Sequence, residues 1–90
     1  MKIKNAELLD ILENTAEKLG IKLTYENLHR GEVNTTGGVC ELRGERRIIV
    51  HKGLTVSEKV DVLTDILGTI DTEGVHLAPG VRERLEAARR

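Results

Sequence analysis

The sequence predicts an α+β domain in which a small, mainly antiparallel three-stranded sheet is covered on one face by helices, in the order α-β-β-β-α-α. Two long segments repeat apolar residues at helical spacing, and the segments between them alternate apolar and polar residues as strands do. The chain has 90 residues, which supplies one hydrophobic core and leaves no room for a second. We therefore expect a single domain over residues 1–90.

The first helix is expected over residues 5–19, where apolar residues form one stripe and charged residues take the opposite face. Asn5 is a suitable N-cap, and Gly20 fits the left-handed position that ends many helices. A strand is then expected over residues 21–26, because three apolar residues alternate there with polar ones.

The polar segment 27–38 predicts a loop, and residues 39–43 and 47–51 predict two strands of a hairpin. A two-residue loop at Gly44-Glu45 would mix apolar and polar residues on both faces, whereas a three-residue loop at 44–46 aligns the apolar residues of the two strands. We therefore expect the three-residue loop, with these residues facing the core: Cys40, Leu42, Ile48 and Val50.

The central helix is expected to begin at a capping box formed by Thr55 and Glu58. Apolar residues recur at helical spacing from there to Ile70. Val62 and Ile66 widen the apolar arc beyond one stripe, so this helix should contact more than the sheet alone.

A glycine within the central helix and a proline after it predict how the chain ends. Gly68 costs about 1 kcal/mol relative to alanine in a helix, which indicates a close backbone approach or a weakened last turn. Residues 75–78 are expected to be extended, and Pro79 suits the first position of a short last helix. The apolar residues of that helix are Val81, Leu85 and Ala88.

The composition excludes several classes of function. Lys and Arg number 14 against 15 Asp and Glu, for a net charge of -1, and Tyr25 is the only aromatic residue. A chain without a basic surface or stacking rings is not expected to bind nucleic acid, and no apolar stretch suits a membrane. Cys40 is alone and the N-terminal residues do not resemble a signal peptide, so we expect a cytoplasmic protein.

Residues that could carry chemistry are few. The soft or borderline metal ligands lack the spacing of a zinc site; they are His29, Cys40, His51 and His76. No nucleophile, P-loop or dinucleotide motif occurs, so no cofactor is predicted. Asp61, Asp65 and Thr69 share one helix face, which we interpret as the solvent side of the central helix rather than an acid–base pair.

The segment from Leu8 to Ile70 resembles the small metallopeptidase-like domains of the ImmA/IrrE type, which are minimal zincins. The similar features are the end of the first helix at 16–21, the hairpin with 47–50, and the helix that runs from Ser57-Glu58 to Gly68. In that family the helix carries His-Glu-x-x-His, whose two histidines hold zinc and whose glutamate activates water.

Here the corresponding window is Asp65-Ile66-Leu67-Gly68-Thr69, so the resemblance implies a fold without its peptidase activity. We expect a non-catalytic, zincin-like module that acts through protein contacts, either with a partner or with a second copy. The expected surface comprises Val62, Ile66, Val75 and Leu77. The alternative is a metal-binding protein or divergent metal-dependent hydrolase that uses Asp61, Asp65 and His76, with Thr69 and Glu73 nearby.

Overall fold

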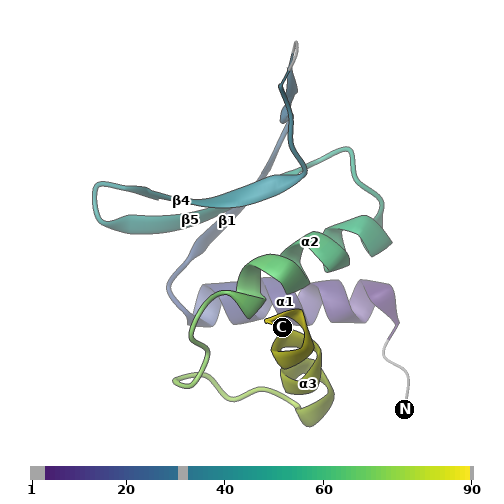
Figure 1. Ribbon diagram of the computed structural model, residues 1–90, viewed down its shortest axis with the longest axis vertical. Coiled ribbons are helices and arrows are strands. Elements are labelled where there is room, and N and C mark those ends of the chain that lie inside the picture. Colours follow the sequence, from purple (N-terminus) through teal and green to yellow (C-terminus); the bar gives the residue numbers. More distant parts are fainter. Residues whose placement is uncertain (1–3, 31–32, 90) are drawn as a thin grey trace.

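The computed structural model describes residues 4–30 and 33–89 and confirms the predicted α+β class, with the helices on one face of a three-stranded sheet (Figure 1). The helices are α1 (Asn5–Lys18), α2 (Val56–Gly68) and α3 (Pro79–Ala88). The strands are β1 (Lys22–Glu26), β2 (His29–Arg30), β3 (Val33–Asn34), β4 (Gly37–Leu42) and β5 (Glu45–His51). None of the helices in the described part of the chain is both long and apolar enough to span a bilayer.

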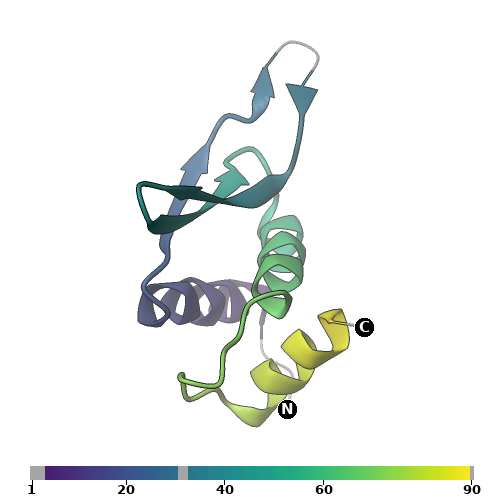
Figure 2. The same ribbon diagram turned by 60° about the vertical axis from the view of Figure 1, so that its left-hand side comes forward.

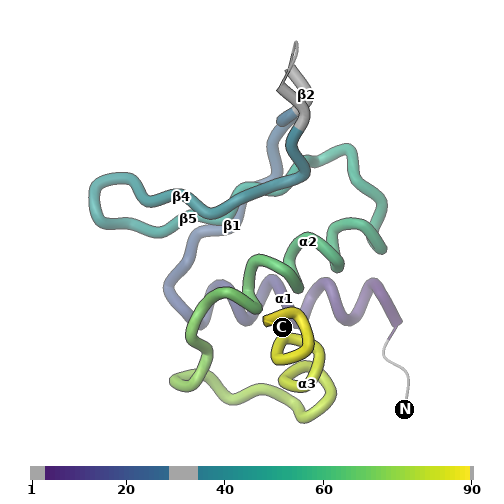
Figure 3. Tube along the Cα trace, viewed as in Figure 1, coloured from purple at the N-terminus to yellow at the C-terminus, as the bar shows by residue number. Residues whose placement is uncertain are grey.

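The sheet is mixed, with the strand order β1-β5-β4. Strand β5 lies in the centre, antiparallel to β4 and parallel to β1, so His51 is at the end of the central strand. The segment predicted as a loop contains the short antiparallel ribbon β2–β3. In Figure 2 this ribbon lies beyond the end of the sheet and away from the helices, and Figure 3 shows the chain leaving β1 and returning into β4 at that end.

The helix ends follow from local signals with one exception. Gly20 takes φ 75°, as its position after α1 predicted, and Pro79 opens α3. The capping box of α2 is complete, because the Glu58 N–H donates to the Thr55 hydroxyl at 3.1 Å and the Thr55 N–H donates to the Glu58 carboxylate at 2.9 Å. The prediction that Asn5 caps α1 is wrong: Lys4 occupies that position and makes no side-chain cap.

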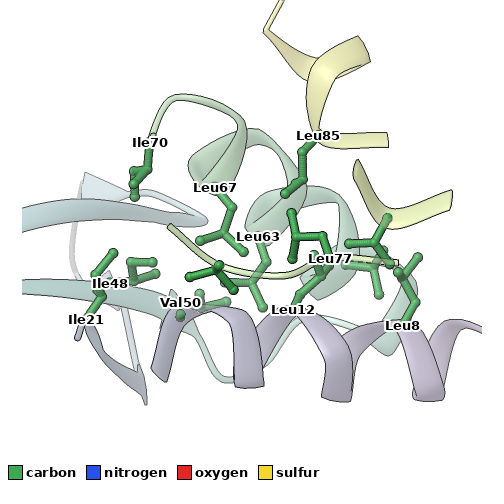
Figure 4. Close-up of a cluster of buried hydrophobic side chains, with 14 residues drawn as sticks. Leu8, Leu12, Ile21, Ile48, Val50, Leu63, Leu67, Ile70, Leu77 and Leu85 are labelled. Carbon is green, nitrogen blue, oxygen red and sulfur yellow. The ribbon is translucent and has the colours of Figure 1, made fainter. Parts of the chain in front are cut away.

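The core lies between the sheet and the helices, and Figure 4 shows side chains from every layer meeting there. Leu63 and Leu67 of α2 are fully buried between α1 and α3, with Leu12 and Leu85 among their neighbours. Helix α2 contacts α1, α3, β5 and β4, which confirms that its wide apolar arc serves more than the sheet.

Gly68 marks a close approach between α2 and α3, which is the first of the two alternatives that the sequence left open. A Cβ atom on Gly68 would lie 3.0 Å from the Cβ of Ala88 and 3.1 Å from the carbonyl oxygen of Leu85. Such distances leave almost no room for a methyl group. The glycine therefore lets the two helices pack closely at the end of α2.

The hairpin differs from the prediction. Its turn has two residues, Arg43 and Gly44, with φ 54° and 79°, and these positive values are typical of the type I′ turn that matches strand twist. Leu42 pairs with Glu45 and Cys40 with Arg47, so the expected three-residue loop is wrong. Cys40 and Leu42 are exposed and lie on the face away from the helices; only Ile48 and Val50 of the predicted set are in the core.

The register of β4 against β5 depends on Gly37, which takes the position where an apolar residue would otherwise pair with a core residue of β5. Gly37 lies opposite Val50, and a Cβ there would come within 2.7 Å of the Ile49 carbonyl oxygen and 3.1 Å of Val62 Cγ1. The side chain of Val62 on α2 thus occupies the space that an apolar residue of β4 would need. The core side of β4 requires no large side chain at this point.

Candidate functional site: the outer edge and open face of β4

The apolar surface predicted from the sequence is largely internal. Val75 and Leu77 are buried at 8% and 6% exposure, because the segment between α2 and α3 folds back onto the core. Val62 and Ile66 are half-buried and pack against the same core. The prediction that these four residues form an exposed interaction surface is therefore wrong.

The alternative polar site does not assemble into a metal centre. Asp61, Asp65, Thr69, Glu73 and His76 are all exposed. The Asp61 carboxylate pairs with the Arg84 guanidinium at 3.3 Å, and the Thr69 hydroxyl donates to the Ile66 carbonyl. Within residues 4–30 and 33–89, no three His, Cys, Asp or Glu side chains come close enough together to hold a metal ion.

A hollow of 350 Å³ between α1 and β1 contains Tyr25, whose hydroxyl donates to the Glu13 carboxylate. Burial, and then the bond to Glu13, raise the pKa of Tyr25 well above its ordinary value. The Lys59 ammonium lies 4.8 Å from the centre of the Tyr25 ring. These groups are engaged with one another and tie α1, β1 and α2 together, which indicates a structural role.

A second hollow of 520 Å³ lies where α2 and α3 end. Arg89 closes it from one side by donating to the carbonyl oxygens of Gly68 and Ile70, both at 2.8 Å. Its guanidinium therefore satisfies carbonyls that the end of α2 leaves without a helical partner. These contacts explain how α3 is anchored against the end of α2.

The outer edge of β4 carries backbone groups that can bond to another strand. The His51 N–H donates to the Thr36 carbonyl at 2.9 Å, which identifies Thr36 and His51 as a hydrogen-bonded pair. Hydrogen-bonded and non-bonded pairs alternate in an antiparallel ladder. Gly38, Cys40 and Leu42 therefore bond inward to β5, whereas Val39 and Glu41 direct their N–H and C=O groups outward. No strand in the described part of the chain pairs with that side.

An apolar hollow adjoins this edge on the open face of the sheet, which no helix covers in Figure 1. It encloses 220 Å³ and is lined by Leu28, Thr35, Gly37, Gly38, Val39, Cys40 and Ile49. A Cβ on Gly38 would meet no heavy atom within 4 Å, so this position leaves open space beside the strand. Close by, Val39 and Leu42 are large apolar side chains exposed at 46% and 55%.

The candidate site is therefore a strand edge with an apolar hollow beside it. The sequence does not predict this site, because its apolar pattern places Cys40 and Leu42 in the core. Two adjacent glycines at the start of a strand were the available signal, since glycine in a strand often marks a place where another backbone approaches closely.

Comparisons of the chain with known protein families, curated proteins and solved structures found no match. The resemblance to minimal zincins consequently stays a prediction from the sequence. The chain's own geometry is the basis for the function proposed below.

Proposed function

We propose that this protein is a non-catalytic module that binds an extended protein segment by adding it as a strand to the outer edge of β4. The observation that carries the proposal is the pair of outward-facing backbone groups at Val39 and Glu41 beside the apolar hollow at Gly38. In strand addition, main-chain hydrogen bonds supply affinity and pockets for alternate side chains supply specificity. The edge of β4 offers both features.

The size of the hollow supports a side chain of a bound segment and not a small molecule. Pockets for drug-sized ligands enclose about 300–1,000 Å³. The hollow beside β4 encloses 220 Å³, and its lining is apolar apart from the Thr35 hydroxyl, the Cys40 thiol and backbone groups. An apolar side chain that projects from an added strand would fit these dimensions and this chemistry.

The exposure of β4 also supports the proposal. Natural sheets usually protect their edges with charges, prolines or bulges, because an open edge pairs readily with other chains. Strand β4 has one charged residue, Glu41, and its first four residues are Gly-Gly-Val-Cys. An edge with so little protection is suited to pairing with a partner.

Selection from a random library of nine-residue peptides displayed on phage tests the proposal and does not require the natural partner to be identified. We expect enriched peptides with apolar residues at alternate positions, and we expect them to shift the backbone amide resonances of Val39 and Glu41. Val39→Pro removes one outward N–H, which the β4–β5 ladder does not use, and should weaken binding roughly tenfold or more. Val39→Ala keeps the N–H and is the matched control.

Two outcomes would contradict the proposal. One is that no peptide is enriched on the folded protein. The other is that the enriched peptides bind the Val39→Pro variant as tightly as the Val39→Ala variant, which would place their site away from this strand edge.

A further inference from the structure

We infer that the segment that pairs with β4 is β4 of a second copy of this chain, in an antiparallel register whose two-fold axis passes through Cys40. This inference rests on the proposed function, because it identifies the occupant of the same strand edge. It would join the two sheets into one continuous sheet, with both helical layers on the same face.

The backbone pattern permits this register. A two-fold axis at Cys40 places Val39 opposite Glu41 of the second copy, and Glu41 opposite the second Val39. Both residues direct their N–H and C=O groups outward, so each of these pairs can exchange two hydrogen bonds. A shift by one residue would set an outward-facing residue against an inward-facing one and lose these bonds.

The side chains on the open face are complementary under the same axis. Leu42 and Gly38 each lie two residues from Cys40, so the axis sets Leu42 of each copy directly opposite Gly38 of the other. Leu42 is an exposed apolar side chain, at 55% exposure, and Gly38 leaves the apolar hollow empty. Directly opposite residues share a face of the sheet, so each Leu42 would enter the hollow of the other copy.

The neighbouring registers that keep the backbone bonds fit less well. An axis at Glu41 places two like charges directly opposite each other, which is destabilising. An axis at Val39 sets Leu42 opposite Thr36, beyond the hollow, and leaves the hollow to the smaller side chain of Cys40. The register centred on Cys40 is the one that fills the hollow with the exposed leucine.

Disulfide cross-linking of the full chain tests this register. Cys40 is the only cysteine, and the axis would hold it opposite its own copy in a non-hydrogen-bonded pair. The Cα atoms of such pairs lie about 4.5 Å apart, within the range that a disulfide bridges. Oxidation by copper–phenanthroline, which removes two electrons and two protons from the two thiols, should yield a covalent dimer.

Moving the cysteine provides the matched control. In Cys40→Ser with Glu45→Cys, which keeps Leu42 and Gly38, the new thiol is exposed, but three strand spacings, or about 14 Å, would separate the two copies of β5. That variant should cross-link roughly tenfold more slowly or not at all, because a disulfide spans at most about 7 Å between Cα atoms. In Cys40→Ser with Val39→Cys and Glu41→Cys, each new cysteine lies opposite a cysteine of the second copy while Leu42 and Gly38 are kept, so the covalent dimer should return.

The results separate this inference from the proposed function. Equal cross-linking of the wild type and of the Glu45→Cys variant, or no cross-linking of any variant, would overturn the register and the second copy as occupant. Peptide binding that is weakened by Val39→Pro would still support strand addition in that case. Failure of both experiments would remove both proposals.

Discussion

Alanine at two adjacent glycines should have opposite effects on stability, and the comparison tests the register of the edge strand. Gly37 faces the helices, where a Cβ would lie 2.7 Å from the Ile49 carbonyl oxygen. Gly38 faces solvent, where a Cβ would meet no heavy atom within 4 Å. The two residues have neighbouring positions in β4 and differ in the side of the sheet that they face.

The expected magnitudes follow from these contacts. Gly37→Ala forces a backbone carbonyl or α2 to move, and such overpacking costs about 1–3 kcal/mol. Gly38→Ala reduces the conformational freedom of the unfolded chain without strain in the folded one, which stabilises by about 0.4–1 kcal/mol. The two variants should therefore differ by at least about 1.4 kcal/mol, or roughly 6 °C or more in Tm for a domain of this size.

Urea denaturation followed by circular dichroism measures the free energy of unfolding of both variants. The protein should be dilute enough for light scattering to give the mass of one chain, so that pairing between copies does not contribute. Equal stabilities, or a larger loss for Gly38→Ala, would refute the register of β4, because a slip by one residue exchanges the two faces of a strand.

Three further predictions concern the pKa of Tyr25, the capping box at the start of α2 and the buried side chain of Leu63. The phenol of Tyr25 should ionise above the ordinary tyrosine pKa near 10, as read from absorbance at 295 nm, which is specific because the chain has no Trp and one Tyr. Because the pKa of Tyr25 is raised in the folded protein, its contribution to the free energy of unfolding is fully present below the ordinary tyrosine pKa and is lost as the pH rises through the folded pKa. Glu13→Gln removes the charged acceptor and should lower the pKa of Tyr25 in the folded protein. Thr55→Ala should cost about 1 kcal/mol of unfolding free energy in urea, because it removes the hydroxyl that accepts from the Glu58 N–H. Leu63→Ala should cost about 2–5 kcal/mol in the same assay, since this side chain is fully buried.

The helices and their ends could be predicted because their signals are local. The capping box at Thr55 and Glu58, the left-handed Gly20 and the leading Pro79 each act within one turn of helix. Gly68 indicated either a close approach or a weakened last turn, and the contacts with α3 decide for the close approach. Asn5 failed as a cap because the helix starts one residue earlier than a cap at that position allows.

The hairpin could not be predicted because its register depends on α2. Matching Cys40 and Leu42 to Ile48 and Val50 assumed that both strands supply apolar residues to the core. Val62, which is distant in sequence, fills the space at Gly37 instead. The parallel pairing of β1 with β5 is equally non-local, because three strands separate them along the chain.

Predicting the candidate site would have required the same register of β4 against β5. With Cys40 and Leu42 assigned to the core, the predicted open face kept Val39 and Ile49 but not the leucine beside the edge, and it did not suggest a binding surface. Val75 and Leu77 were assigned to the surface because an extended segment between helices gives no periodic signal of burial. Both errors arose where tertiary packing decides which side of an extended segment is covered.

Amide hydrogen exchange along β4 tests most directly whether its outer edge is open. At a concentration at which light scattering gives one chain, we expect the N–H groups of Val39 and Glu41 to exchange rapidly and those of Gly38, Cys40 and Leu42 to exchange slowly. Slow exchange at all five residues, or the reverse alternation, would show that the edge is already covered or that the strand has the other register.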